Sequence, residues 1–113
     1  MKKTVLIMIL ATLAISCESR TYEEISDNRQ ITETVKYTAD VKPIMDANCL
    51  SCHGATTFKP YTNYAQVKAN IDIILERIQR PTGDPQKMPQ GSSLSQTQIN
   101  TILKWKADGL QEN

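Results

Sequence analysis

The sequence predicts a single all-α domain, and three features of the chain support that prediction. Apolar residues recur at helical spacing in three separate stretches, and a good capping residue stands near the start of each. No stretch shows the alternation of apolar and polar residues that is typical of a strand. A chain of 113 residues fits one domain. We therefore expect three to four short helices joined by long loops.

Residues 1–16 have the pattern of a secretory signal peptide. Lys2 and Lys3 give a positive start, residues 5–15 form an apolar run, and small Ser16 precedes Cys17. A helix that crosses a bilayer needs about 20 apolar residues, and this run is shorter. The segment LAISC resembles the lipobox of bacterial lipoproteins, which implies that Cys17 is lipid-modified and anchors an exported chain to a membrane. Without that modification, Cys17 belongs to a removed leader.

Residues 17–36 are polar, charged and weakly patterned, so we expect a lipidated N-terminus and tether here and a domain over 37–113. Only Ile31 and Val35 would suit a packed strand. Two of the 13 basic side chains are Lys2 and Lys3, which leaves 11 basic against 12 acidic ones and no basic patch for nucleic acid. Large apolar side chains are few, which favours a metal, disulfide or cofactor in the core.

The first helix is expected to begin with Asp40 as N-cap and to run to about Asn48. Pro43 falls in its first turn, where a missing N–H costs nothing because those groups lack helical partners. Its apolar face is predicted to consist of Val41, Ile44 and Met45.

The middle helical stretch begins after Thr62 or Asn63, either of which can cap it. Asn70 is expected to mark a bend between two shorter helices. A loop with three prolines follows over residues 81–91. The apolar stripe of this stretch is Val67, Ile71, Ile74, Leu75 and Ile78.

The last helix has the clearest start signal in the chain. Ser95 and Gln98 have the spacing of a capping box, with Leu94 and Ile99 at the positions of a hydrophobic staple. Gly109 is expected to end the helix in the left-handed conformation. The predicted apolar face is Ile99, Ile102 and Leu103, with Trp105 near its edge.

The segment CLSCH, residues 49–53, is the attachment signature of a c-type haem. Thiols three residues apart on a turning backbone can each reach one vinyl group of the same porphyrin. We predict thioethers at Cys49 and Cys52 and a bond from Nε2 of His53 to the iron. The Nδ1–H of His53 then needs an acceptor, and the carbonyl of Pro60 is the candidate.

Other uses of this motif fit less well. A thioredoxin-like pair needs a βαβ context, which the pattern lacks, and structural zinc usually takes four protein ligands. A structural disulfide between Cys49 and Cys52 stays open in an exported protein, although it leaves the adjacent His53 unexplained.

A methionine sulfur is a known second ligand of haem iron. Met88 lies in the proline-rich loop, 35 residues after His53, and Pro89 favours an extended conformation for it. Met45 lies on the apolar face of the first helix, which favours a packing role. We predict Met88 as the second axial ligand.

The segments YTADVKPIMDANCLSCHG and MPQGSSLSQTQINTILKWKADG resemble the small monohaem c-type cytochromes, as found in exported bacterial lipoproteins. The resemblance covers about residues 37–110 and implies a cytochrome c-like fold around one covalent haem, with the first and last helices crossing beside it. The family usually has an aromatic residue where this chain has Met45, which fits packing of Met45 against Ile102 and Trp105.

The resemblance implies single-electron transfer through an exposed haem edge, so we expect a monomeric electron carrier rather than an enzyme. It would serve redox partner proteins on the periplasmic side or cell surface of a bacterial membrane. A gas sensor or peroxidase with an open distal position, and a domain with purely structural haem, are the alternatives. Candidates for binding the haem propionates are Tyr61, Tyr64, Arg77, Arg80 and Trp105.

Overall fold

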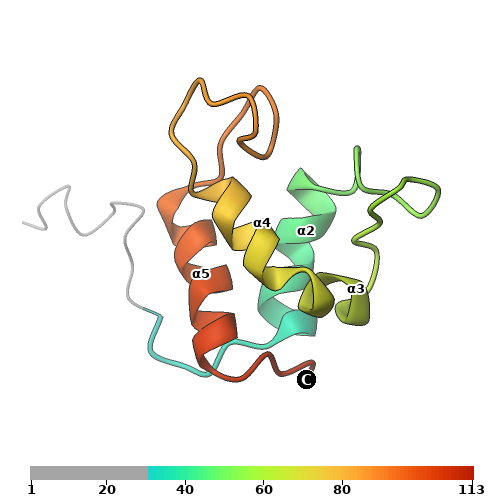
Figure 1. Ribbon diagram of the computed structural model, residues 1–113. Helices are drawn as coiled ribbons and strands as arrows, with labels where there is room; N and C mark the ends of the chain where they lie inside the picture. Colours follow the sequence, from blue (N-terminus) through green and yellow to red (C-terminus); the bar gives the residue numbers. More distant parts are fainter. Residues whose placement is uncertain (1–30) are drawn as a thin grey trace, which may run out of the picture.

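The computed structural model describes residues 31–113, so Cys17 and the predicted signal peptide lie outside the described residues. Within 31–113 the chain forms helices and no strand, which agrees with the all-α prediction (Figure 1). None of the helices in this part is both long enough and apolar enough to cross a membrane. In chain order the elements are η2 (Tyr37–Val41), α2 (Lys42–Asn48), α3 (Tyr64–Ala69), α4 (Ile71–Ile78) and α5 (Gln96–Ala107).

The first helix begins earlier than expected, with a wide π-helical turn, η2, that leads directly into α2. The N-cap position is Lys36, so the prediction of Asp40 as N-cap is wrong. Asp40 lies inside the first turn, where its Oδ2 accepts a hydrogen bond from the backbone N–H of Lys36 at 2.8 Å. The carboxylate thus satisfies a backbone donor from within the helix. Pro43 is the second residue of α2, one position earlier than expected, and it lies in the first turn of that helix as predicted.

The middle stretch is two helices that meet at Asn70, as predicted. The side chain of Asn63 caps α3 by accepting a hydrogen bond from the N–H of Gln66 at 3.0 Å. The Asn70 side chain in turn donates to the carbonyl of Gln66 at 2.8 Å, which fixes the junction. Every member of the predicted stripe is buried, namely Val67, Ile71, Ile74, Leu75 and Ile78.

Helix α5 begins at the predicted capping box. Ser95 Oγ accepts from the N–H of Gln98 at 3.2 Å, and the Gln98 side chain accepts from the N–H of Ser95 at 2.9 Å. Gly109 follows the helix with a φ of 96°, the left-handed conformation that was expected. Leu103 does not belong to the core face, because it is 37% exposed, whereas Trp105 is completely buried.

An aromatic cluster joins the two ends of the described chain. The Tyr37 ring lies 5.6 Å from the Tyr64 ring and 5.7 Å from the Trp105 ring, between centroids. The indole N–H of Trp105 donates to the carbonyl of Gln111 at 2.9 Å, and the N–H of Tyr37 donates to the same carbonyl at 2.8 Å. The start of η2 and the C-terminal tail therefore pack at one end of the molecule (Figure 1).

Packing begins before the predicted domain boundary at residue 37. Val35 is 1% exposed and belongs to the core, and Ile31 packs against it. The N–H of Val35 donates to Oδ2 of Asp108 at 2.8 Å, and Lys104 Nζ lies 2.8 Å from the same oxygen. The last residues of the expected tether are thus held against the end of α5.

Asp108 is expected to make the stability of the domain sensitive to acid. The Lys104 ammonium, and then the N–H of Val35, lower the pKa of the Asp108 carboxyl. Its contribution is therefore complete above the ordinary aspartate pKa of about 3.9 and is lost as pH falls through the lower folded value. Asp108→Asn should lower stability at about pH 7 and make no difference at about pH 2, as measured by urea unfolding.

Asp72→Asn is the matched control, because Asp72 also pairs with a lysine, Lys106, but its side chain is 81% exposed. Exposed ion pairs contribute little, so this variant should unfold like the wild type at both pH values. A difference between wild type and Asp108→Asn that persists unchanged at about pH 2 would contradict the assignment.

Candidate functional site

The CLSCH segment forms a tight turn directly after α2. Cys49 is the C-cap of the helix, and its carbonyl accepts from the N–H of Cys52 at 3.2 Å and of His53 at 2.9 Å. These two bonds fold the segment back on itself. The Cys49 side chain is consequently half-buried against Met45, with 3.9 Å between the two sulfurs, while Cys52 is exposed.

The orientation of His53 is set by the loop that follows it. Nδ1 of His53 lies 2.8 Å from the carbonyl oxygen of Lys59, and the N–H of Tyr61 donates to the His53 carbonyl at 2.9 Å. A carbonyl only accepts, so in the neutral imidazole the proton is on Nδ1 and the lone pair is on Nε2. The acceptor is the carbonyl of Lys59, whereas the prediction was the carbonyl of Pro60. The hydrogen bond from the N–H of Tyr61 to the His53 carbonyl holds this part of the loop beside the imidazole, and the carbonyl within reach of Nδ1 is that of Lys59.

Met88 is held by the C-terminal end of α4. Its N–H donates to the carbonyl of Arg77 at 3.1 Å, and Nζ of Lys87 donates to the carbonyl of Arg80 at 2.8 Å. The Met88–Pro89 peptide bond is cis. Although the loop has no regular structure, the backbone at Met88 is therefore fixed to α4, whose apolar stripe is buried.

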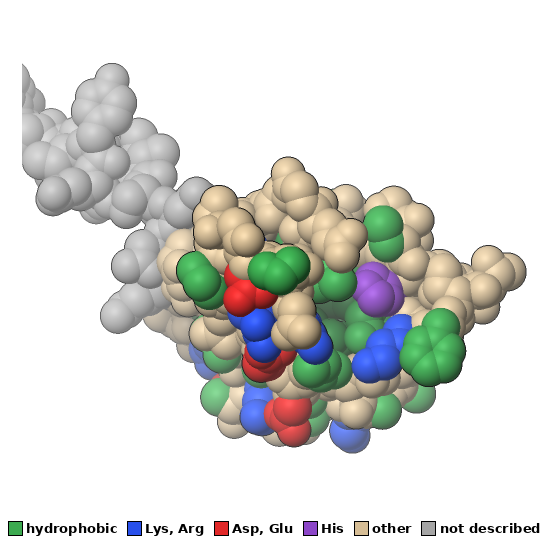
Figure 2. Space-filling model, turned by 45° about the horizontal axis from the view of Figure 1, so that its top comes forward, with side chains coloured by type: hydrophobic (Ala, Val, Ile, Leu, Met, Phe, Trp, Pro, Cys, Tyr) green, Lys and Arg blue, Asp and Glu red, His purple; other side chains and the backbone are tan. Residues whose placement is uncertain are grey.

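One cavity of about 450 Å³ is lined by all four residues that the sequence predicts as haem ligands, Cys49, Cys52, His53 and Met88. Its volume lies in the range of cofactor sites, about 300–1,000 Å³. Figure 2 shows the hollow on this face, with the histidine colour at its edge and hydrophobic side chains around it. Its lining includes Cys49, Cys52, His53 and Met88, together with Met45, Tyr61, Ile73, Ile74, Arg77 and Ile78.

A larger hollow, of about 570 Å³, lies within the proline-rich loop. Its walls come only from residues 82–93 and contain no cysteine, histidine or methionine. It shares Pro89, Gln90 and Ser92 with the cavity next to His53. Of these two cavities, only the smaller one is lined by cysteine, histidine and methionine residues.

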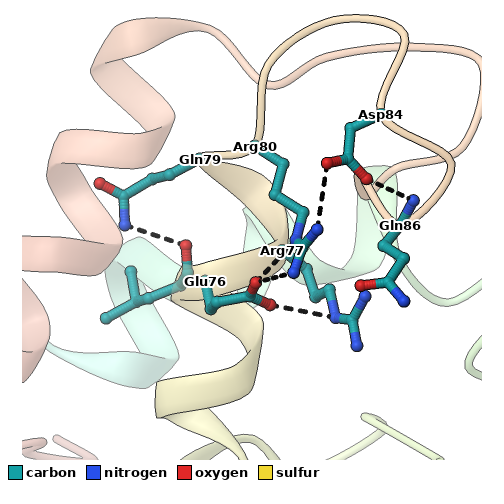
Figure 3. Close-up of polar contacts among 7 residues, drawn as sticks. Glu76, Arg77, Gln79, Arg80, Asp84 and Gln86 are labelled. Atoms are coloured by element: carbon teal, nitrogen blue, oxygen red, sulfur yellow. Dashed lines mark hydrogen bonds and ion pairs between the residues drawn. The ribbon is translucent and has the colours of Figure 1, made fainter.

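Among the predicted propionate partners, only Tyr61 and Arg77 line the cavity. Arg80 is turned towards Glu76 and towards Asp84, which it contacts at 3.0 Å (Figure 3). Tyr64 and Trp105 lie in the aromatic cluster, where both donate to backbone carbonyls of the C-terminal tail. Arg77 is bonded to Glu76 at 3.1 Å and is the one arginine or lysine on the cavity lining.

The two thiols lie in different environments. Burial raises the pKa of the Cys49 thiol to about 11, whereas Cys52 is exposed. Because the thiolate is the reactive form, we expect Cys52 of the haem-free chain to be alkylated at least about tenfold faster than Cys49 at neutral pH. Peptide mapping after a timed iodoacetamide pulse measures both sites in one sample. Equal labelling, or faster labelling of Cys49, would show that the turn exposes both thiols.

Sequence reasoning missed two parts of the site. Ile73 lines the cavity although it lies outside the buried stripe of α4, and an apolar residue next to such a stripe was the available signal for a second apolar surface. The Lys59 carbonyl had no signal of its own, because any backbone carbonyl can accept and only the path of the loop selects one.

The donor set in the cavity fits a covalently bound haem. It offers two thiols, an imidazole with an accessible lone pair, a thioether and an apolar wall from α4. Within residues 31–113 no three His, Cys, Asp or Glu side chains come together as a metal-binding group. Comparisons with protein-family models, with curated proteins and with solved structures found no match to this chain. The function proposed below is therefore based on the residues that line the cavity.

Proposed function

We propose that this protein is an electron carrier that holds one haem c in the cavity between the CLSCH turn, α4 and the Met88 loop. The observation that carries the proposal is the meeting of Cys49, Cys52, His53 and Met88 around one cavity, although Met88 is 35 residues away from His53 in the sequence. Haem iron bound by histidine and methionine supplies one-electron chemistry at a comparatively high potential.

Each protein group has a defined task in this proposal. Cys49 and Cys52 form the thioethers that fix the porphyrin. His53 donates its Nδ1–H to the Lys59 carbonyl, which sets the tautomer and raises the basicity of Nε2 towards the iron. Met88 presents its sulfur from a backbone fixed to α4.

The walls of the cavity complete the binding site. Ile73, Ile74 and Ile78 offer an apolar surface that excludes water from the porphyrin plate. Arg77 is a cation on the lining that can pair with a propionate while it stays bonded to Glu76. An apolar surface with a cation beside it suits an amphipathic porphyrin with acidic substituents.

The export signal and the lipobox-like Cys17 add a location to the proposal. The carrier is tethered by lipid to a bacterial membrane, on the periplasmic side or the cell surface, and meets redox partner proteins there. Because Val35 is buried and its N–H is bonded to Asp108, Val35 belongs to the folded domain and not to the tether. A shorter tether keeps the domain closer to its membrane partners.

A haem sensor or peroxidase is the second candidate, and the irregular loop around Met88 favours it. The loop residues 79–95 contain no helix, and Met88 itself is partly exposed. If the sulfur left the iron readily, the distal position would open for a gas or a peroxide. The same optical measurement distinguishes this candidate from the carrier.

The test is a mass measurement and optical spectra of the full chain, made in a host that matures c-type cytochromes. We expect the mass of one added haem, a six-coordinate low-spin spectrum with a sulfur-to-iron band, and reversible reduction. Colourless protein with the mass of the polypeptide alone would contradict haem binding. A high-spin spectrum with rapid carbon monoxide binding would support the sensor or enzyme. A bound haem that shows no accessible redox change would support a structural role.

A further inference from the structure

We propose that Tyr61 is a positioning residue for His53 and that its ring sets the plane of the imidazole, an inference that rests on the proposed haem site. The two rings are stacked, with 4.5 Å between their centroids and 24° between their planes. Tyr61 is 7% exposed, so its ring cannot turn away into solvent without leaving the core. The Tyr61 ring is therefore a fixed surface against which the imidazole of His53 is held.

The stack supplies a restraint that the hydrogen bonds do not. The bond from Nδ1 to the Lys59 carbonyl, 2.8 Å long, holds one atom of the imidazole and lets the ring tilt about that atom. The bond from the N–H of Tyr61 to the His53 carbonyl, 2.9 Å long, ties the two backbones together. With one face of the imidazole against Tyr61, the direction of the Nε2 lone pair is also fixed.

The ring of Tyr61, and not its hydroxyl, is the part that acts on His53. Tyr37 and the partly buried Tyr64 pack with Trp105 away from the cavity, whereas Tyr61 and His53 line the same cavity. Among the hydrogen bonds of residues 31–113 none involves the Tyr61 hydroxyl, while Tyr64 donates to the carbonyl of Leu110 at 2.7 Å. Phenylalanine at position 61 should therefore preserve the arrangement.

The plane of an axial imidazole has a direct spectroscopic consequence. In low-spin ferric haem the unpaired electron is distributed over the porphyrin according to the orientation of the axial ligands. The proton shifts of the four ring methyl groups consequently report that orientation. A change in general stability alone does not reorder these shifts, so they separate positioning from packing.

The test compares Tyr61→Leu, Tyr61→Phe and Tyr64→Leu in the haem-loaded full chain, with the haem content of each checked by mass. We expect Tyr61→Leu to change the order or spread of the ferric methyl shifts, and Tyr61→Phe to keep the wild-type pattern. Tyr64→Leu removes a partly buried aromatic ring from the other cluster and should keep the pattern as well. Wild-type shifts in Tyr61→Leu, or equal changes in Tyr61→Phe and Tyr61→Leu, would overturn the proposal.

Failure of the haem proposal leaves a different result. If the wild-type chain carries no haem, the protons of the His53 ring become the probe, because the ring current of a stacked Tyr61 moves their shifts upfield. Tyr61→Leu should then remove this displacement and Tyr61→Phe should keep it. Identical His53 shifts in the two variants would overturn the positioning role independently of haem.

Discussion

Met88→Ala is expected to abolish the sulfur-to-iron band of the haem-loaded protein while the haem stays attached. The proposed thioethers at Cys49 and Cys52 do not depend on the sulfur of Met88, so the mass of the variant should still exceed that of its polypeptide by one haem. Loss of the sulfur opens the distal position, so carbon monoxide should bind rapidly, and the reduction potential should fall because methionine ligation raises it. Optical spectra and a redox titration measure these effects.

Met45→Ala is the matched control for this result. Met45 also lines the cavity, and its sulfur lies 3.9 Å from that of Cys49, so distance alone does not exclude it as a ligand. However, it is 1% exposed and packed in the core, and truncation should cost about 2–5 kcal/mol of stability and leave the band in place. The reverse outcome would assign the ligand to Met45.

Trp105→Ala is expected to have the largest effect on stability, about 3–5 kcal/mol. The indole is fully buried, lies 5.7 Å from the Tyr37 ring and donates to the Gln111 carbonyl at 2.9 Å. Its removal leaves a cavity and breaks the bond that ties α5 to the C-terminal tail. The free energy of unfolding of a small domain is about 5–15 kcal/mol, so this loss should be a large fraction of it. Denaturant unfolding measures the loss.

Leu103→Ala provides the comparison within the same helix. Leu103 lies two residues before Trp105 and is 37% exposed, and alanine is a better helix former. We expect a change of less than about 1 kcal/mol, whereas Trp105→Phe, which keeps a ring but loses the indole N–H, should be intermediate. Equal losses in Leu103→Ala and Trp105→Ala would show that the aromatic cluster does not hold the domain together.

The parts of the fold that were predictable are those that depend on neighbours in the sequence. The capping box of Ser95 and Gln98, the Asn63 cap and the junction at Asn70 all involve residues three or four positions apart. Such contacts form whenever the helix forms, so spacing is enough to predict them. The same reasoning placed the CLSCH turn after the first helix.

The parts that the sequence did not predict are those where one side chain or backbone group has several competing partners, both near and far away in the chain. Val35 was assigned to a tether because nothing near it shows that Asp108, 73 residues later, accepts its N–H. Arg80 was a candidate for the haem propionates, but Asp84 and Glu76 hold it instead. Asp40 was expected outside the helix, and only the wide turn of η2 shows that it reaches back to Lys36 from inside. Spacing alone cannot rank such competing partners.

The packing of the first helix against the C-terminal tail has a practical consequence for electrochemistry. The N–H of Tyr37 is bonded to the carbonyl of Gln111 and the N–H of Thr38 to that of Glu112, whereas the cavity is lined by residues at and after the other end of α2. The seven residues of α2 alone span about 10 Å. A gold-binding tag fused after Asn113 would therefore immobilise the protein on an electrode with its candidate redox centre turned towards the solution.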